Sequence, residues 1–142
     1  MKEYHTLEKA KREEIIQKIK QALSMKKEVL FSYAFGSFLD SPSFRDIDIG
    51  VYVKKIIQSQ VFDYELQLSH DVAEKCNLPF GFFEVKVLNF APPSFLNNIF
   101  CQGQLLFSKD KILLSDMIED VSLEMVANEG IASQSLQELI PS

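Results

Sequence analysis

The stretch AFGSFLDSPSFRDIDIGV, residues 34–51, decides the fold that we expect for this 142-residue chain. An apolar run leads into Gly36-Ser37, and a second apolar run contains Asp46 and Asp48. Successive side chains of a strand point to opposite faces, so the two carboxylates share one face while the aliphatic residues beside them face the core. The sequence therefore predicts two strands connected through a Gly-Ser turn, with two carboxylates on the face away from the core.

The residue types in this stretch are typical of a site for a metal-bound triphosphate. Two carboxylates roughly 6.5 Å apart along a strand can bind one divalent cation, and a hard cation such as Mg2+ neutralises the phosphate charge that repels an attacking oxygen. Gly36 lets the backbone approach the phosphates, and Ser37 offers a hydroxyl and an N–H at the start of a helix. Gly50 lies on the face of Asp48 and is expected to leave space for the ligand. The alternative for an Asp-x-Asp pair taken alone is a solvated strand face or a turn cap.

A third acidic residue lies in the later run FGFFEVKVLN, residues 80–89. Strand alternation turns the apolar residues to the core and leaves Glu84 on the face of Asp46 and Asp48, provided that the two strands pair. Glu84 then completes a three-carboxylate cluster or acts as general base on an incoming hydroxyl. The alternative is a solvated edge-strand charge that pairs with a neighbouring lysine.

These motifs resemble those of the minimal nucleotidyltransferases, or MNT domains, of the DNA polymerase β superfamily. The family pattern is Gly-Ser, a variable loop, Asp-x-Asp and an acidic residue on a later strand. The resemblance runs from about Leu30 to Phe107 and includes the turn at residues 88–93 and the ending at residues 103–107. It implies an α+β fold with a small mixed β-sheet, helices packed on one face and a metal–nucleotide site on the other.

The resemblance also implies roles for particular residues, with ATP as substrate and one or two Mg2+ ions. It assigns nucleotide binding to Gly36, Ser37 and Arg45, and metal binding and catalysis to Asp46, Asp48 and Glu84. Arg45 stands where the family usually has Ser or Thr, and we expect it to contact phosphate bidentately, with a solvated loop charge as the alternative. Glu84 stands where the family usually has Asp. These two departures leave catalytic turnover open, because in-line geometry is sensitive to shifts of about 1 Å.

The implied activity is transfer of AMP from ATP to a hydroxyl, with release of pyrophosphate. The resemblance further implies an antitoxin of a type VII-like toxin–antitoxin pair, which binds a HEPN-domain toxin and AMPylates one of its tyrosines. Two alternatives stay open. One is a small-molecule adenylyltransferase of the aminoglycoside type, which normally needs additional helices to shape an acceptor pocket. The other is a catalytically inactive binding module that neutralises its partner by contact alone.

Composition indicates one globular domain over residues 1–142, with a core at about 8–107 and a helical C-terminal segment at about 109–140. The content is 46% hydrophobic and 25% charged, and the formal net charge of −5 disfavours nucleic acid, and with it RNA tailing, as the main partner. Cys76 and Cys101 lie far apart, which favours a reducing compartment. No stretch of about 18 apolar residues occurs, so we expect a cytoplasmic protein away from membranes. Homo-oligomer formation stays open.

Local periodicity predicts the remaining elements. Helices are expected at about residues 7–26, 61–76, 94–101 and 110–125, and strands at about 29–35, 46–51 and within 80–89. We expect Gly103 to end the third helix in a left-handed conformation, and Gly130 and Pro141 to belong to a loose tail or a short final helix. The basic residues of the first helix are expected on a solvated face. Phe38 and Phe44 are candidates for stacking on a nucleotide base.

Overall fold

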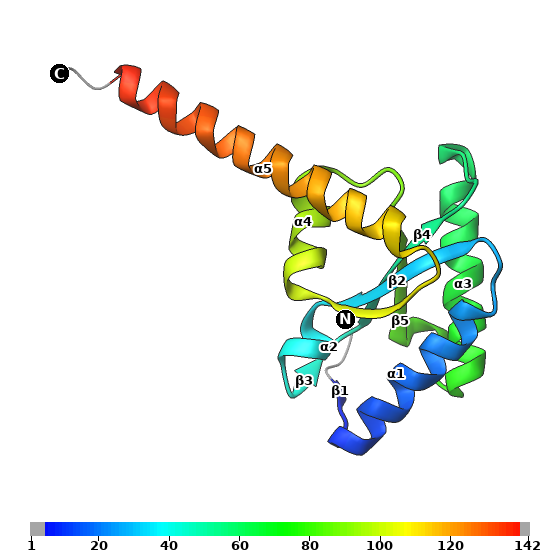
Figure 1. Ribbon diagram of the computed structural model, residues 1–142. Coiled ribbons are helices and arrows are strands. Elements are labelled where there is room, and N and C mark those ends of the chain that lie inside the picture. Colours follow the sequence, from blue (N-terminus) through cyan, green and yellow to red (C-terminus); the bar gives the residue numbers. More distant parts are fainter. Residues whose placement is uncertain (1–4, 140–142) are drawn as a thin grey trace.

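The computed structural model describes the backbone of residues 5–139 and the side chains of residues 6–128. The elements follow one another along the chain, and Figure 1 labels most of them. They are β1 (His5–Thr6), α1 (Lys9–Ser24), β2 (Val29–Phe35), α2 (Ser37–Asp40), β3 (Ser43–Phe44), β4 (Ile47–Val53), η1 (Gln58–Gln60), α3 (Val61–Cys76), η2 (Phe80–Phe82), β5 (Phe83–Val87), α4 (Pro93–Gln102), β6 (Gln104–Ser108) and α5 (Lys111–Leu139).

The central sheet is small and mixed, as the sequence predicts. Its order is β5-β4-β2-β6, with β4 and β5 parallel and the other neighbours antiparallel. Helix α3 forms the crossover between the two parallel strands, since parallel neighbours cannot be joined by a tight turn. The short strands β1 and β3 form a separate antiparallel pair. The predicted α+β fold class is therefore confirmed.

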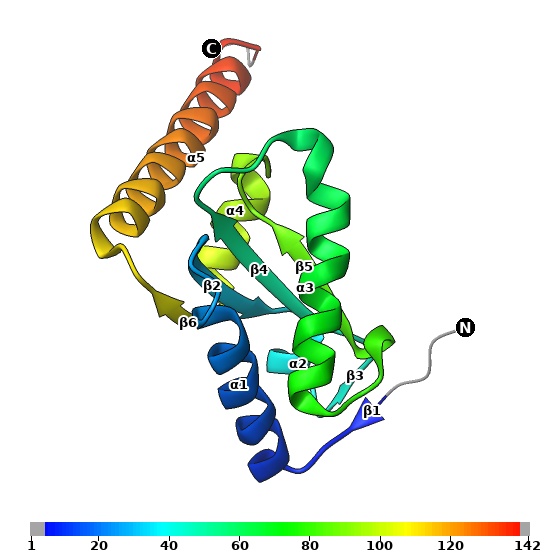
Figure 2. The ribbon, with the colours of Figure 1, turned by 90° about the vertical axis from the view of Figure 1, so that its right-hand side faces the viewer.

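Helices α1 and α3 cover one face of the sheet, in front of it in Figure 2. The apolar residues of α1 recur at helical spacing, and those of β4 and β5 alternate along their strands, so both sets reach the same core. The core residues from these elements are Ile15, Ile19, Leu23, Ile47, Ile49, Val51, Leu68, Val72, Phe83, Val85 and Val87. The strand alternation that places the carboxylates of β4 on the opposite face is thus confirmed.

The opposite face carries a second apolar cluster beneath α4 and the first half of α5. Its buried members are Phe31, Tyr33, Leu88, Leu96, Ile99, Leu114 and Val121. Helices consequently pack against both faces, where we expected one helical face and one face left to the site. The reason lies in β2, whose Phe31 and Tyr33 point away from α1 and α3 and need apolar cover of their own.

Two helix ends differ from expectation. Gly103 ends α4 in an extended conformation, with φ −80° and ψ 171°, so the left-handed assignment was wrong. A Cβ at Gly103 would lie 2.6 Å from the Ile99 carbonyl oxygen and 3.0 Å from that of Ala34, so close backbone approach explains the glycine. Among the described residues the left-handed cap is Asn77, with φ 56°, at the end of α3.

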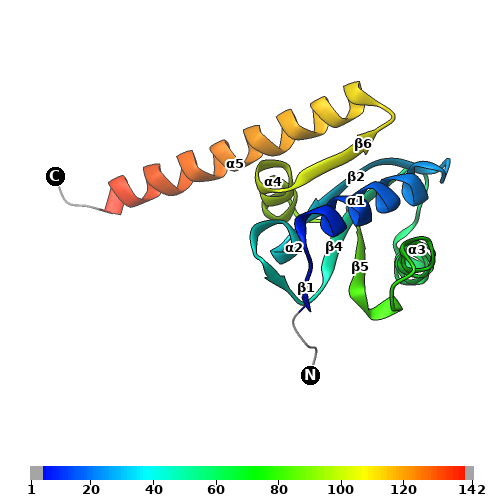
Figure 3. The same cartoon turned by 90° about the horizontal axis from the view of Figure 1, so that it is seen from below.

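The C-terminal segment forms one helix where we expected a helix and a loose tail. Helix α5 runs for 29 residues and continues through Gly130, and Figure 3 shows it passing α4 and extending beyond the sheet. Pro141 lies outside the described residues. None of the helices in the described part of the chain is both long and apolar enough to cross a membrane.

Candidate active site

The Gly-Ser turn lies directly against the carboxylate of Asp48. Strand β2 ends at Phe35, which pairs with Asp48 across the antiparallel β2–β4 ladder. Gly36 follows with φ 83°, a left-handed conformation that favours glycine. A Cβ on Gly36 would also collide with Asp48 Oδ2. Two independent constraints therefore select glycine here, and both bring the turn and the aspartate together.

The third predicted carboxylate lies on the neighbouring strand. In the parallel β4–β5 ladder Asp48 is the register partner of Glu84, and neighbouring strands lie about 4.8 Å apart. Glu84 is exposed between buried residues of β5, so it shares the face of Asp48. Asp46 precedes β4 and is partly buried. Glu84 and Asp46 therefore both lie close enough to Asp48 to interact with it electrostatically.

Asp48 is the most electrostatically perturbed member of the group. Burial, together with the negative charges of Glu84 and Asp46, raises its pKa to about 6, and the positive charge of Lys86 opposes the rise. Crowded carboxylates in a partly desolvated place are a common feature of functional sites. A bound cation would reduce the electrostatic repulsion among these carboxylates.

Lys86 is a site residue that the sequence analysis did not assign. Its Nζ lies 3.2 Å from Glu84 Oε1, so the alternative of a lysine-paired Glu84 also describes this structure. The signal was available, since residues two apart on a strand share a face. Lys86 therefore partly neutralises the carboxylates of Glu84 and Asp48.

The donor set fits Mg2+ bound together with a nucleotide. Among the residues whose side chains are described, no group of three or more His, Cys, Asp or Glu side chains is placed so that it could hold a metal ion by itself. Mg2+ is usually bound by one or two carboxylates plus substrate phosphates and water. Asp46 and Asp48 are two hard oxygen donors, and Asp48 lies against the Gly36 turn, so the residue types fit this ion.

Comparison with protein families decides which group of proteins this is. The family described as "Polymerase beta, Nucleotidyltransferase" matches residues 17–112, from α1 to the start of α5. The chain belongs to this nucleotidyltransferase family. No curated protein sequence is similar enough to count as a relative.

Solved structures share the nucleotidyltransferase fold. A chain of the complex of a tri-AMPylated Shewanella oneidensis HEPN toxin with MNT antitoxin aligns with a TM-score of 0.57 at 15% identity, over 93% of this chain and 97% of that one. A chain of a toxin–antitoxin complex with AMP-PNP gives 0.60 at 16% identity, over 89% and 95%. The MntA-HepT toxin–antitoxin complex gives 0.56 at 14% identity, over 92% and 97%.

The two remaining predicted nucleotide-binding residues lie at the margin of the nucleotidyltransferase site. Ser37 is exposed at the first position of α2, where its carbonyl accepts a hydrogen bond from the Ser41 N–H. Arg45 is exposed in the residue pair between β3 and β4, next to Asp46. Their positions beside Gly36 and Asp46 agree with the predicted contacts to phosphate, which stay predictions.

Two expectations about the ligand's surroundings were wrong. Gly50 faces Leu88, and a Cβ there would lie 2.9 Å from the Leu88 side chain, so a core residue fills the space that we expected for the ligand. Phe38 and Phe44 are 2% and 0% exposed, with ring centroids 4.9 Å apart in an edge-to-face pair. Buried rings cannot stack on a base, and we withdraw that role.

Arg12 organises the loop between the Gly-Ser turn and the two aspartates. Its guanidinium donates hydrogen bonds to the carbonyls of Phe38, Ser41 and Pro42, and it lies 5.2 Å and 5.1 Å from the ring centroids of Phe38 and Phe44. The sequence analysis placed this residue on a solvated helix face, which was wrong. Nothing in the local pattern of α1 distinguishes Arg12 from its lysine neighbours, because its partners are about 30 residues away.

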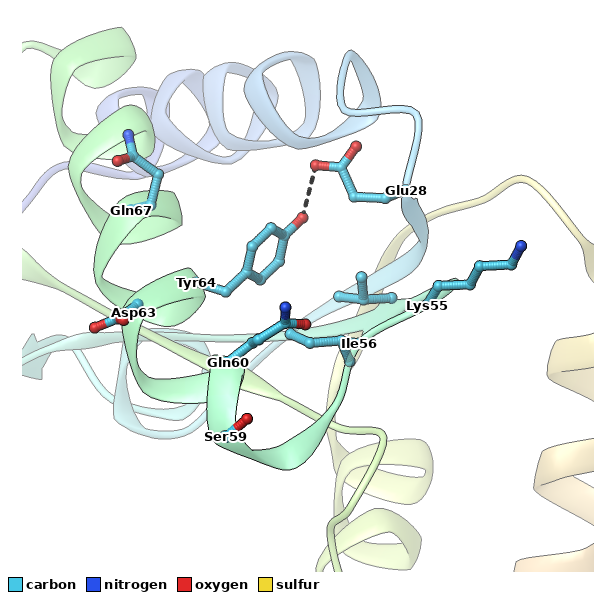
Figure 4. Close-up of a pocket in the computed structure, with 9 residues that line it drawn as sticks. Glu28, Lys55, Ile56, Ser59, Gln60, Asp63, Tyr64 and Gln67 are labelled. Carbon is cyan, nitrogen blue, oxygen red and sulfur yellow. Dashed lines mark hydrogen bonds between the residues drawn. The ribbon is translucent and has the colours of Figure 1, made fainter.

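A pocket lies on the face of the sheet that α1 and α3 cover, and none of the predicted site residues lines it. Figure 4 shows its polar lining, which includes Lys55, Gln60 and Tyr64, and its volume is about 500 Å³. The Tyr64 hydroxyl donates a 2.9 Å hydrogen bond to Glu28. This contact ties the start of α3 to the segment before β2 and accounts for the hollow as a feature of packing.

Proposed function

We propose that this nucleotidyltransferase is Mg2+-dependent and transfers AMP from ATP to a hydroxyl of a protein partner. The observation that carries the proposal is the partly buried Asp48 against the Gly36 turn, with its pKa raised by burial and by the negative charges of Glu84 and Asp46. Isolated carboxylates on a solvated strand would spread apart. Here the fold holds them together against their repulsion, as a cation site requires.

In the proposed reaction Asp46 and Asp48 hold the ion, and Gly36 and Ser37 position the triphosphate through the backbone and a hydroxyl. Bound Mg2+ supplies neutralisation of the phosphate charge. The acceptor oxygen forms a bond to the α-phosphorus while the bond to the bridging oxygen of the β-phosphate breaks. Glu84 accepts the hydroxyl proton, and pyrophosphate leaves.

We further propose that the protein partner is a HEPN-domain toxin and that the chain is its antitoxin. Two of the similar structures support this, one a complex with a tri-AMPylated HEPN toxin and one a toxin–antitoxin complex with AMP-PNP. The acceptor would then be a tyrosine hydroxyl of the toxin. The Glu84–Lys86 ion pair favours one competing function, a contact-only antitoxin, because a base held by lysine is a weaker base.

Titration calorimetry of ATP with and without Mg2+ tests the first step. We expect Mg2+-dependent binding to the wild-type chain, loss of binding in Asp48→Asn, and no change in Asp63→Asn, which alters an exposed acid of α3. Transfer of label from α-phosphate-labelled ATP to a candidate HEPN-domain toxin tests the second. Neutralisation of the toxin by Asp48→Asn in cells would favour the contact-only function.

A further inference from the structure

We propose that the groove between α3 and β5, the outermost strand of the sheet, is the acceptor subsite of the proposed reaction, and that it takes an apolar or aromatic segment of a protein. The proposal rests on the proposed function, which leaves the acceptor's place undefined. The groove has a volume of about 410 Å³. Its lining includes Phe62, Leu66 and Ser69 of α3, Phe80 of η2, and Glu84 and Lys86 of β5.

Large apolar side chains gather along this groove although water surrounds them. Phe62 is 69% exposed, and Leu66 and Phe80 are each 42% exposed. Single exposed apolar residues are ordinary, but a group along one hollow marks an interaction site. A groove of this size accommodates an aromatic ring with its neighbouring side chains.

The edge of β5 is already occupied, which defines how a partner can bind. The Val85 N–H donates to Ser69 Oγ at 3.3 Å, and the Val87 N–H donates to Glu65 Oε2 at 2.7 Å. These side chains of α3 take the N–H groups that an added strand would need. The groove is therefore suited to side chains of an acceptor and closed to pairing by a strand, including the same strand of a second copy.

Glu84 connects the groove to the proposed chemistry. It lines the groove and is also the register partner of Asp48 on the neighbouring strand, so one end of the groove lies on the strand next to the proposed site. Glu65 and Glu84 outnumber Lys86 among the charged residues of the lining. This balance repels a phosphate backbone and favours a neutral hydroxyl on an apolar segment.

The test compares the groove with another exposed apolar surface of the same chain. The groove variant is Phe62→Gln/Leu66→Gln. The control is Leu123→Gln/Val126→Gln on the outer face of α5, where the two residues are 60% and 65% exposed. Exposed positions are chosen so that both variants fold. Calorimetry measures Mg2+-ATP binding, and labelled AMP transfer to a candidate HEPN-domain toxin gives kcat and KM for the acceptor.

We expect the groove variant to bind Mg2+-ATP within twofold of wild type and to lose about 30-fold in kcat/KM for the acceptor, mostly through KM, because each apolar side chain contributes about tenfold or less. The control should keep both values. Transfer by the groove variant at the wild-type rate, or loss in the α5 control alone, would refute the subsite and leave the proposed function intact. Wild-type chain that binds Mg2+-ATP but transfers nothing would overturn both.

Discussion

Replacing Asp48 with asparagine should stabilise the metal-free chain while it abolishes Mg2+-ATP binding. The carboxylate is partly buried, abuts the Gly36 turn and lies beside Glu84 and Asp46, and the pKa of Asp48 is raised to about 6 by burial and by these negative charges. Asparagine has the same shape and no charge. The substitution therefore removes the repulsion with little change in packing, as often happens when a functional residue is lost.

The magnitude follows from the shift of the Asp48 pKa. A rise from the ordinary value of 3.8 to about 6 corresponds to about 3 kcal/mol of destabilisation by the ionised form. Asp48 is only partly buried, and water screens its interactions, so we expect about 1 to 1.5 kcal/mol to be recovered. For a chain of this size that raises the melting temperature by about 4 °C.

The pH dependence distinguishes this electrostatic effect from a change in packing, because only the electrostatic effect varies with the ionisation of Asp48. Because the folded-state pKa of Asp48 lies above the unfolded value, the destabilisation is absent below about pH 4, grows between about pH 4 and 6, and is complete above about pH 6. Asp48→Asn should melt about 4 °C above wild type at pH 7.5 and level with it at pH 4.

Thermal unfolding followed by circular dichroism in EDTA measures the effect, with Asp63→Asn as the exposed-acid control. A melting temperature of Asp48→Asn at or below wild type at pH 7.5 would refute the electrostatic account, and so would an equal increase at pH 4. Addition of Mg2+ and ATP should then stabilise wild type and leave Asp48→Asn unchanged, because ligand binding to the folded state alone raises stability.

Two further substitutions test the elements that shape the site. Gly36→Ala should destabilise the chain by about 1–3 kcal/mol, because it strains a residue with φ 83° and drives a methyl group into Asp48. Urea unfolding measures this loss of stability. As the control, Gly81→Ala should change stability far less, because a Cβ at Gly81 meets nothing within 4 Å. Arg12→Lys should lower the free energy of unfolding by about 1–3 kcal/mol, because lysine cannot donate to several carbonyls at fixed angles. It should also weaken Mg2+-ATP binding in calorimetry, because the loop between Gly36 and Asp46 is held less firmly. A variant with wild-type stability and affinity would show that other contacts hold this loop.

The elements that carry the site were predictable from sequence because they depend on local periodicity. Alternation along β4 placed Asp48 opposite the aliphatic residues that meet α1 and α3, and helical spacing gave α3 at residues 61–76. The glycine before Ser37 indicated a turn that other residues adopt poorly. These signals lie within a few residues of one another, so no knowledge of distant neighbours was needed.

The tertiary structure alone decided what those elements meet. Glu84 became the partner of Asp48 only through the parallel pairing of β5 with β4, and Leu88 filled the space above Gly50. The carbonyl groups that Arg12 binds lie about 30 residues further along the chain, and its guanidinium packs over the ring of Phe38. Periodicity records which side of an element is apolar or polar, but pairing between distant segments is set by the whole core, because each apolar face must be covered by whichever element is near it.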